Sequence, residues 1–376
     1  MEENKQALRV FLVDIVNKDI TPELLEDRMN ELESLLTTYG GLVVLKKFQK
    51  KDQPDYHTYI GKGKLEEIMA DMMRLDSNLL IIGNVLKPSQ IYHINELLRP
   101  IGATVRDRVD LILKIFDKHA TSMESRLQVE LAAIRHMGPR IFGMGMELSK
   151  QGGNAGGGKW AMRGIGETNT EIMKRHLKYK VLKIEKELKE YEQMRKLHRE
   201  SRIRKGMPTV GIVGYTNTGK SSLLNAMTKK GILAENKLFA TLWTHVGKVY
   251  IMKNPETGEG KEILLNDTIG FIRDLPPKLI KSFSSTLEDS IESDLLLHVI
   301  DASDPFVDER ISIVNHILDE IGAKQKRIML FNKIDLLNKN QLTEIKKHFP
   351  DKKNIRISVK DAIGFEEIKK SIINNL

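Results

Sequence analysis

Apolar and polar positions alternate along the first 118 residues in a way that predicts short strands separated by helices. The expected strands are four apolar runs, at residues 8–16, 42–48, 79–82 and 103–105. Thr21–Pro22 predicts a helix start, since threonine is a good N-cap and proline suits the first helical position. Further amphipathic helices are expected over residues 64–75 and 89–98. This alternation is typical of a small α/β domain, which we place at residues 1–118.

A region with helical spacing follows at residues 119–206, and we expect it to form a hairpin. The spacing predicts a first helix over residues 121–137, ending at Gly138–Pro139. Residues 151–166 are so rich in glycine that a loop is expected there. The first helix is predicted from the spacing of four apolar residues, Met123, Leu127, Leu131 and Ile134.

A second, longer helix is expected over residues 171–205, which contain neither glycine nor proline. Its apolar positions are spaced by four and three residues, as in a coiled-coil seam: Leu177, Val181, Ile184, Leu188 and Tyr191. We expect this helix to fold back antiparallel on the helix over residues 121–137.

The remaining residues, 207–376, alternate apolar strands with helical stretches. The expected strands are residues 210–213, 263–265, 295–300, 328–331 and 355–357. Strands that alternate with helices predict a parallel sheet covered by helices on both faces. The whole chain is therefore predicted to be α/β: a small N-terminal α/β domain, a helical hairpin and a doubly wound domain.

The charge of the chain adds a candidate partner. Lysine and arginine outnumber aspartate and glutamate by 60 to 51, a net charge of +9, and residues 171–205 alone hold 13 basic residues against six glutamates. Such a helix has either a solvated charged face or a nucleic-acid contact surface, and both interpretations stay open. The candidate contacts are Lys159, Trp160, Arg163, Arg195 and Lys196.

Composition also excludes several classes of protein. The chain has no cysteine, which rules out disulfide scaffolds, zinc–thiolate sites and thiol catalysis. No secretory signal opens the sequence, and no run approaches the roughly 18 apolar residues of a membrane span, so we expect a cytosolic monomer. The ten histidines show neither H-E-x-x-H nor H-x-x-E-H spacing, and we expect no metal beyond Mg²⁺ and K⁺.

Residues 214–221 carry the strongest chemical signal in the sequence. Gly214 to Ser221 match the phosphate-binding loop G-x-x-x-x-G-K-[ST], between an apolar strand and a helix. Such a loop points backbone N–H groups at phosphate, while Lys220 reaches the β- and γ-phosphates and Ser221 binds Mg²⁺. The expected nucleotide contacts here are Asn217, Thr218, Gly219, Lys220, Ser221 and Ser222.

Three later motifs select guanine. Residues 267–270 (Asp-Thr-Ile-Gly) offer Asp267 to Mg²⁺ through water and the Gly270 N–H to the γ-phosphate. A carboxylate at Asp335 can accept both N1–H and N2–H₂ of guanine, which adenine lacks. The expected base contacts are Asn332, Lys333, Asp335, Ser358, Val359 and Lys360. Each motif follows an expected strand, in the order that a doubly wound sheet requires, and the set is that of translation-factor-related GTPases.

Catalysis needs a threonine from a switch segment and a way to position water. Thr241 is the candidate third Mg²⁺ ligand and Thr244 the second choice, the alternative being a buried strand threonine. Phe271 stands where Ras-like GTPases place a water-orienting glutamine. Asn217 is either a K⁺ ligand or a hydrogen bonder that shapes the loop. We expect slow hydrolysis, stimulated by K⁺ or a docked partner, with this catalytic set: Lys220, Thr241 and Gly270.

These motifs together resemble the HflX family of ribosome-associated GTPases over nearly the whole chain. The resemblance lies in residues 59–64, 107–116, 127–131, 163–171, 214–217, 238–242 and 267–276. It implies that the N-terminal domain and hairpin dock on the large ribosomal subunit, where GTP hydrolysis is stimulated and stalled or idle ribosomes are split. Any membrane association would then run through ribosomes.

Two features depart from the family pattern. Residues 243–245 read Trp-Thr-His where the family usually has Asp-Pro-Thr, which bears on the switch assignment. The sequence ends at the expected last helix of the GTPase domain, so the extra C-terminal domain of some members is not expected. The alternative function is an RNA or ribosome-assembly switch of the Obg or Era kind. An ATPase is excluded, because its base pocket would need to lack Asp335.

Overall fold

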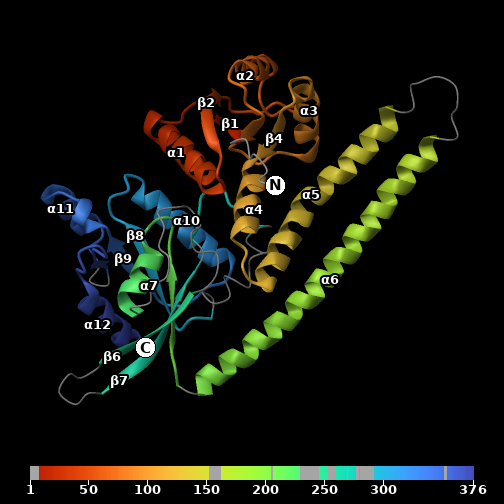
Figure 1. The fold of residues 1–376 in the computed structure, drawn as a ribbon. Helices are drawn as coiled ribbons and strands as arrows, with labels where there is room; N and C mark the ends of the chain where they lie inside the picture. The colour runs from red at the N-terminus through yellow and green to blue at the C-terminus, as the bar shows by residue number, and fades with distance from the viewer. Residues whose placement is uncertain are drawn as a thin grey trace, which may run out of the picture. The chain divides into compact units, whose positions relative to one another are not determined.

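The computed structural model describes residues 8–151, 162–204, 206–228, 245–252, 259–268, 270–276, 279, 292–350 and 354–376 of the chain. These residues belong to two compact units, Met1–Leu188 and Lys189–Leu376, and each unit is described by itself (Figure 1). The sheet is parallel in the first unit and mostly parallel in the second, and both units also contain helices, so the predicted α/β class is confirmed. The described part of the chain contains no helix with the length and apolar character needed to cross a membrane.

The first unit is built on a four-stranded parallel sheet with the order β2-β1-β3-β4. Its strands are β1 (Arg9–Val16), β2 (Leu42–Lys50), β3 (Leu79–Ile82) and β4 (Thr104–Asp107). All four agree with the apolar runs of the sequence to within a few residues. The central strands β1 and β3 are the most buried, as apolar runs covered on both faces should be.

Helices follow the strands of this sheet in alternation. They are α1 (Pro22–Tyr39), α2 (Lys62–Arg74), α3 (Pro88–Leu98) and α4 (Arg108–His119), with a short 3₁₀ turn at Arg99–Ile101. The predicted N-cap is confirmed, since the Leu24 N–H donates to Thr21 Oγ1 at 3.3 Å. Asp107 caps α4 in the same way, accepting the Asp110 N–H at 2.9 Å.

The hairpin helices are longer than the sequence predicts. Helix α5 runs over Met123–Gln151 and α6 over Met162–Arg204. The predicted break at Gly138–Pro139 is therefore wrong, and so is the extension of the loop through Gly166, because both segments are helical. Proline and glycine cost a helix interior about 3 and 1 kcal/mol. In proteins, however, packing of a helix against its neighbours contributes more to helical stability than local propensity does.

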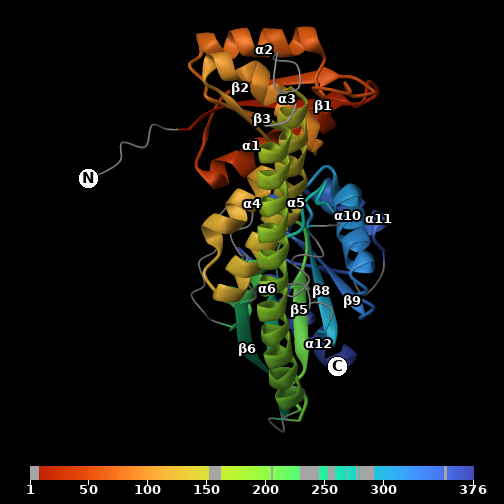
Figure 2. The ribbon, with the colours of Figure 1, turned by 90° about the vertical axis from the view of Figure 1, so that its right-hand side faces the viewer.

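Within the first unit α5 and α6 lie side by side and run in opposite directions (Figures 1 and 2). The predicted seam faces the partner helix: Ile184 is buried, and Leu177, Val181 and Leu188 are half-buried. Two ion pairs join the helices, Arg135–Glu185 at 2.8 Å and Lys180–Glu130. The antiparallel hairpin predicted from the apolar spacing is confirmed.

The second unit holds a six-stranded sheet with the order β10-β9-β8-β5-β7-β6. Its strands are β5 (Thr209–Val213), β6 (His245–Met252), β7 (Gly260–Asp267), β8 (Leu295–Asp301), β9 (Arg327–Asn332) and β10 (Ile355–Arg356). Five strands match predicted ones. Strand β6 was not predicted; it pairs antiparallel with β7, and its exposed and buried residues alternate, as expected of a strand with one solvated face.

Each described helix named here follows a strand of this sheet in the sequence. They are α7 (Lys220–Thr228), α10 (Val307–Glu320), α11 (Lys339–His348) and α12 (Phe365–Asn375), with a 3₁₀ turn at Ile334–Leu336. The carboxyl ends of the parallel strands meet at one edge of the sheet, where ligands of doubly wound folds bind. The motifs of the sequence all lie at this edge, after β5, β7, β9 and β10.

Candidate functional site

The phosphate-loop motif forms the turn between β5 and α7. Gly214 must be glycine, because a Cβ there would lie 2.2 Å from the Val299 carbonyl oxygen of the neighbouring strand. Gly219 has φ = +95°, and a Cβ there would lie 2.4 Å from Asn332 Nδ2. The two motif glycines thus let the loop pass close to β8 and to the residue that ends β9.

Side chains hold the loop in place. Asn332 Nδ2 donates to the Thr218 carbonyl at 2.8 Å, and the Thr218 hydroxyl donates to the Tyr215 carbonyl at 3.1 Å. The Lys220 ammonium donates to the same Tyr215 carbonyl at 2.7 Å. Burial lowers the pKa of Lys220 to about 8, against an opposing effect of the Asp267 charge. Lys220 is therefore a buried cation that a phosphate group would stabilise.

Two side chains whose oxygen atoms could bind a metal ion meet at the start of α7. Ser221 Oγ donates to Asp267 Oδ2 at 2.6 Å, and the Asp267 carboxylate is fully buried at the end of β7. A hydroxyl beside a carboxylate is a donor set that Mg²⁺ accepts. The residues present therefore fit a magnesium ion. Thr241, the predicted third ligand, and its alternative Thr244 lie outside the described residues.

The segment after Asp267 is tied to the phosphate loop by its backbone. The Phe271 N–H donates to the Gly214 carbonyl at 3.1 Å, and the Thr216 N–H donates to the Phe271 carbonyl at 2.8 Å. Gly270 sits against the loop, because a Cβ there would lie 2.9 Å from Lys220 Nζ. The Phe271 side chain is only 1% exposed, so this position presents no polar group to a nucleotide.

The expected base-binding motifs converge at the ends of β9 and β10. Asn332 Oδ1 accepts the Val359 N–H at 3.1 Å, which joins the two motifs directly. The Ser358 hydroxyl donates to Asp335 Oδ1 at 2.8 Å and holds that carboxylate in place. Lys360 follows on the surface. The structure therefore brings together the predicted base-binding residues, which the sequence showed only as separate motifs after successive strands.

Lys333 has a partner that sequence reasoning missed. Its ammonium lies 2.6 Å from Asp301 Oδ2, at the end of β8, and its backbone adopts a left-handed conformation with φ = +63°. The position of Asp301 at the end of a predicted strand could have indicated its role, since the neighbouring strand β9 ends in the lysine motif.

Tyr215, inside the phosphate loop, is the second missed residue. The Arg310 guanidinium lies 4.4 Å from the centre of its ring and donates to its hydroxyl at 3.1 Å. The Arg273 N–H also donates to this hydroxyl, at 2.9 Å. Tyr215 therefore links the loop to α10 and to the segment after Phe271. No sequence motif marks this contact, because Arg310 lies 95 residues away.

The other predicted residues are placed as follows. Asn217 is exposed, with φ = +62°, and Ser222 is half-buried in the first turn of α7. Lys159 and Trp160 lie outside the described residues, as does the side chain of Arg163. The two remaining contact candidates differ in exposure, since Lys196 is exposed and Arg195 is half-buried along the seam side of α6.

Three family models match the sequence in succession. Residues 26–117 match a model described as GTP-binding GTPase N-terminal, and residues 119–202 match GTP-binding GTPase Middle Region. Residues 209–333 match a model described as 50S ribosome-binding GTPase. Together the matched segments cover most of the chain.

Relatives that match most of the length of the chain also point to a GTPase. GTPase HflX of Caldanaerobacter subterraneus is 41% identical over 369 residues, which cover 98% of this chain and 80% of the relative. GTPase HflX of Escherichia coli is 36% identical over 339 residues, which cover 89% and 74%. A crystal structure of SsGBP in complex with GDP is 27% identical, covers 97% of both chains and superposes with a TM-score of 0.51. On the matched motifs, site geometry and relatives, the chain belongs to the HflX family of GTPases.

Proposed function

We propose that this GTPase docks its N-terminal domain and basic hairpin on the large ribosomal subunit and, with GTP bound, splits stalled or idle ribosomes. We also propose three domains, at residues 1–118, 119–206 and 207–376. The family matches over residues 26–117, 119–202 and 209–333 support these boundaries. One observation carries the proposal: a hairpin with a strongly basic helix precedes a guanine-nucleotide site in the same chain.

At the nucleotide site each residue has a proposed role. Lys220 neutralises the β- and γ-phosphates, and the Gly270 N–H donates to the γ-phosphate. Ser221 and Asp267 would hold Mg²⁺, which when bound would supply positive charge against the negative charge of the phosphates. Thr241 remains the proposed third ligand. Asp335 accepts the two donors of guanine, and the Ser358 hydroxyl, which donates to Asp335, supports this orientation.

The proposed intrinsic rate is slow, since the buried Phe271 side chain cannot orient water. A K⁺ ion beside Asn217 would supply positive charge that is otherwise provided by an arginine. The Asn217→Gly variant tests this idea, because glycine accepts the left-handed backbone and removes only the amide. We expect the wild type to turn over faster in K⁺ than in Na⁺, and the variant to lose that difference. A preserved K⁺ preference in the variant would leave Asn217 as a residue that shapes the loop.

Charge on α6 supports ribosomal RNA as the partner. The helix turns its apolar seam inward, and most of its lysines are exposed, including Lys178, Lys183, Lys186 and Lys196. Contacts from lysine and arginine to phosphates dominate the affinity of proteins for RNA. The family model described as 50S ribosome-binding GTPase favours the large subunit among RNA partners.

GTP turnover in K⁺ buffer, with and without purified large subunits, tests the docking. We expect strong stimulation by the subunits in the wild type and a loss of most of it in the double variant Lys178→Glu/Lys186→Glu. The matched control is Lys346→Glu/Lys347→Glu, which reverses two exposed charges on α11. A second variant replaces residues 152–161 with a short Gly-Ser linker, and we expect it to lose stimulation by the subunits as well. Equal rates with and without subunits, despite normal GTP binding, would overturn the proposal.

Splitting needs its own measurement. Intact 70S ribosomes are mixed with the protein and a non-hydrolysable GTP analogue, and the products are separated on a sucrose gradient. We expect the 70S peak to shrink and both subunit peaks to grow. An unchanged 70S peak together with stimulated turnover would favour the alternative, an Obg- or Era-like switch that binds without splitting.

A further inference from the structure

Three potential metal ligands meet in the first unit, far in sequence from the nucleotide motifs. Asp107 ends β4 and caps α4, Asp110 lies in the first turn of α4, and His136 comes from α5. His136 Nε2 lies 3.3 Å from Asp107 Oδ1 and 3.5 Å from Asp110 Oδ1. One ligand atom from each of the three residues falls within 4.8 Å of the others.

The two separations from His136 fit a shared metal ion. Protein ligands bind Zn²⁺ and similar ions through nitrogen or oxygen at about 2.0–2.2 Å, at angles near 90–110°. Two such ligand atoms on one ion are therefore about 3.0–3.5 Å apart. Both His136 distances agree with that range, and both are longer than a good hydrogen bond. One imidazole with two carboxylates is a donor set that divalent transition metals accept.

The ligands are also held in place, as metal ligands usually are. Asp107 is fully buried, and its two oxygens accept backbone N–H groups: Oδ1 from Asp110 at 2.9 Å and Oδ2 from Leu86 at 3.2 Å. The Asp110 and His136 side chains are 12% and 16% exposed. Two carboxylates so close together in a largely buried position favour a nearby cation.

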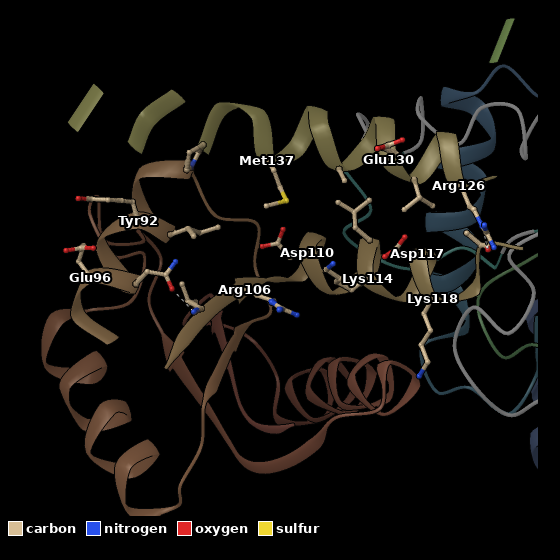
Figure 3. Close-up of a pocket in the computed structure, with 18 residues that line it drawn as sticks. Tyr92, Glu96, Arg106, Asp110, Lys114, Asp117, Lys118, Arg126, Glu130 and Met137 are labelled. Atoms are coloured by element: carbon tan, nitrogen blue, oxygen red, sulfur yellow. Dashed lines mark hydrogen bonds between the residues drawn. The ribbon is translucent and has the colours of Figure 1, made fainter. Parts of the chain in front are cut away.

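A cavity of about 910 Å³ is lined by one of the three ligands, Asp110. It lies between α3, β4, α4 and α5, and its size is that of a small-molecule site. Asp110 and Met137, the residue after His136, extend toward each other into it from α4 and α5 (Figure 3). The cations Lys114 and Arg126 line the same cavity. An ion held by three protein ligands has coordination positions left for a further ligand, and Asp110 is the ligand that also lines this cavity.

We propose that Asp107, Asp110 and His136 bind one divalent transition metal ion of the Zn²⁺ class, with open positions facing this cavity. The ion would link α4 of the N-terminal domain to α5 of the hairpin and offer an electrophilic centre to an anionic oxygen ligand. Sequence spacing did not indicate the site, because His136 lies 29 residues from Asp107 and on another helix. The proposal is independent of GTP hydrolysis.

Zinc binding to the chelator-treated, full-length protein tests the site. Isothermal titration with ZnCl₂ is run with saturating GDP and Mg²⁺, which keep the nucleotide site occupied. We expect one Zn²⁺ per chain in the wild type and affinity about tenfold or more weaker in His136→Gln and in Asp110→Asn. Zn²⁺ should also raise the melting temperature of the wild type and not that of His136→Gln.

The matched control is His348→Gln, which breaks another histidine–aspartate contact, with Asp308 at 3.0 Å, on the surface of the second unit. This variant should bind Zn²⁺ like the wild type. Retained GDP binding and an unchanged far-UV circular dichroism spectrum show that each variant is folded. Equal Zn²⁺ stoichiometry and affinity in the wild type, His136→Gln and Asp110→Asn would overturn the proposal and leave a hydrogen-bonded helix cap.

Discussion

At the scale of single residues, the buried lysine of the phosphate loop makes nucleotide binding depend on pH. Burial lowers the pKa of Lys220 to about 8 in the protein without nucleotide. Phosphate groups stabilise the ammonium, so the pKa must rise when GTP binds. Binding then favours the protonated form, and the affinity for GTP should fall as pH rises above about 8, with little change between pH 6 and 7.

Calorimetry measures this linkage. At pH 8.5, GTP binding should take up a fraction of a proton, seen as a difference in binding heat between buffers of different ionisation enthalpy. The control is Lys220→Arg, which stays charged across this range and should bind more weakly but without proton uptake. Proton release, or equal heats in all buffers, would contradict the assignment.

Asp335 is the residue that we expect to set the base preference. Its carboxylate is held by the Ser358 hydroxyl at 2.8 Å. Replacing it with asparagine turns one of the two acceptor oxygens into a donor, so the two donors of guanine can no longer both be accepted. We expect GTP affinity to fall about 10–100-fold, as for the loss of a bidentate base contact. Xanthosine triphosphate, which presents a carbonyl in place of the N2 amine, should bind Asp335→Asn better than the wild type. Competition against a fluorescent GDP measures the affinities for GTP and for xanthosine triphosphate. If the ratio of the two affinities is the same in Asp335→Asn and the wild type, Asp335 does not contact the base.

The phosphate loop and the guanine motifs could be predicted from sequence, because each is a short local pattern whose function follows from residue type. Arg310 could not, because its partner Tyr215 is 95 residues away. Asp301, whose partner Lys333 is 32 residues away, could have been inferred only from its place at the end of a predicted strand. Phe271 shows the same limit. The lack of a polar side chain at this position was evident from the sequence. The backbone hydrogen bonds that join Phe271 to the phosphate loop were not, because they depend on the fold.

At the scale of elements, the pairing of α5 with α6 rests on a narrow seam in which Ile184 is the most buried position of the described α6 residues. An aspartate there would place a charge in an apolar contact, which costs several kcal/mol. We therefore expect Ile184→Asp to lower the helicity of the hairpin and to abolish stimulation by large subunits while GTP binding remains. Circular dichroism and GTP turnover measure the two effects.

The matched control is the neighbouring substitution Lys183→Asp, which introduces the same side chain at an exposed position. It should keep its helicity and lose only part of the stimulation. Loss of GTP binding in Ile184→Asp would contradict the view that the seam supports the hairpin alone.

Element positions followed from the apolar pattern where burial is strong, as in the continuous runs of β1 and β3 and the seam of α6. Spacing was a poor guide to where helices end. Pro139 and Gly166 disfavour helix locally, yet both lie inside long helices, so local propensity alone did not set the helix ends. Strand β6 was missed because its alternating pattern is weaker than the continuous apolar runs of the central strands.

At the scale of the whole molecule, the net charge of +9 predicts how ribosome binding responds to salt. A protein that contacts RNA phosphates through basic residues releases counterions, and each contact contributes about 0.7–0.9 to the slope of log K against log salt. The affinity of the GTP-analogue-bound protein for large subunits should therefore fall steeply between low and physiological salt. Light scattering or sedimentation over a salt series measures the slope.

The slope also identifies where the contacts lie. If Lys178 and Lys186 each contact a phosphate, reversing both removes two contacts, and the slope should become shallower by about 1.4–1.8. The α11 variant Lys346→Glu/Lys347→Glu carries the same change in net charge, and a purely long-range effect of charge would alter both variants alike. An unchanged slope in the α6 variant would assign the ribosomal contact to another surface, whereas a change confined to α6 assigns it to the hairpin.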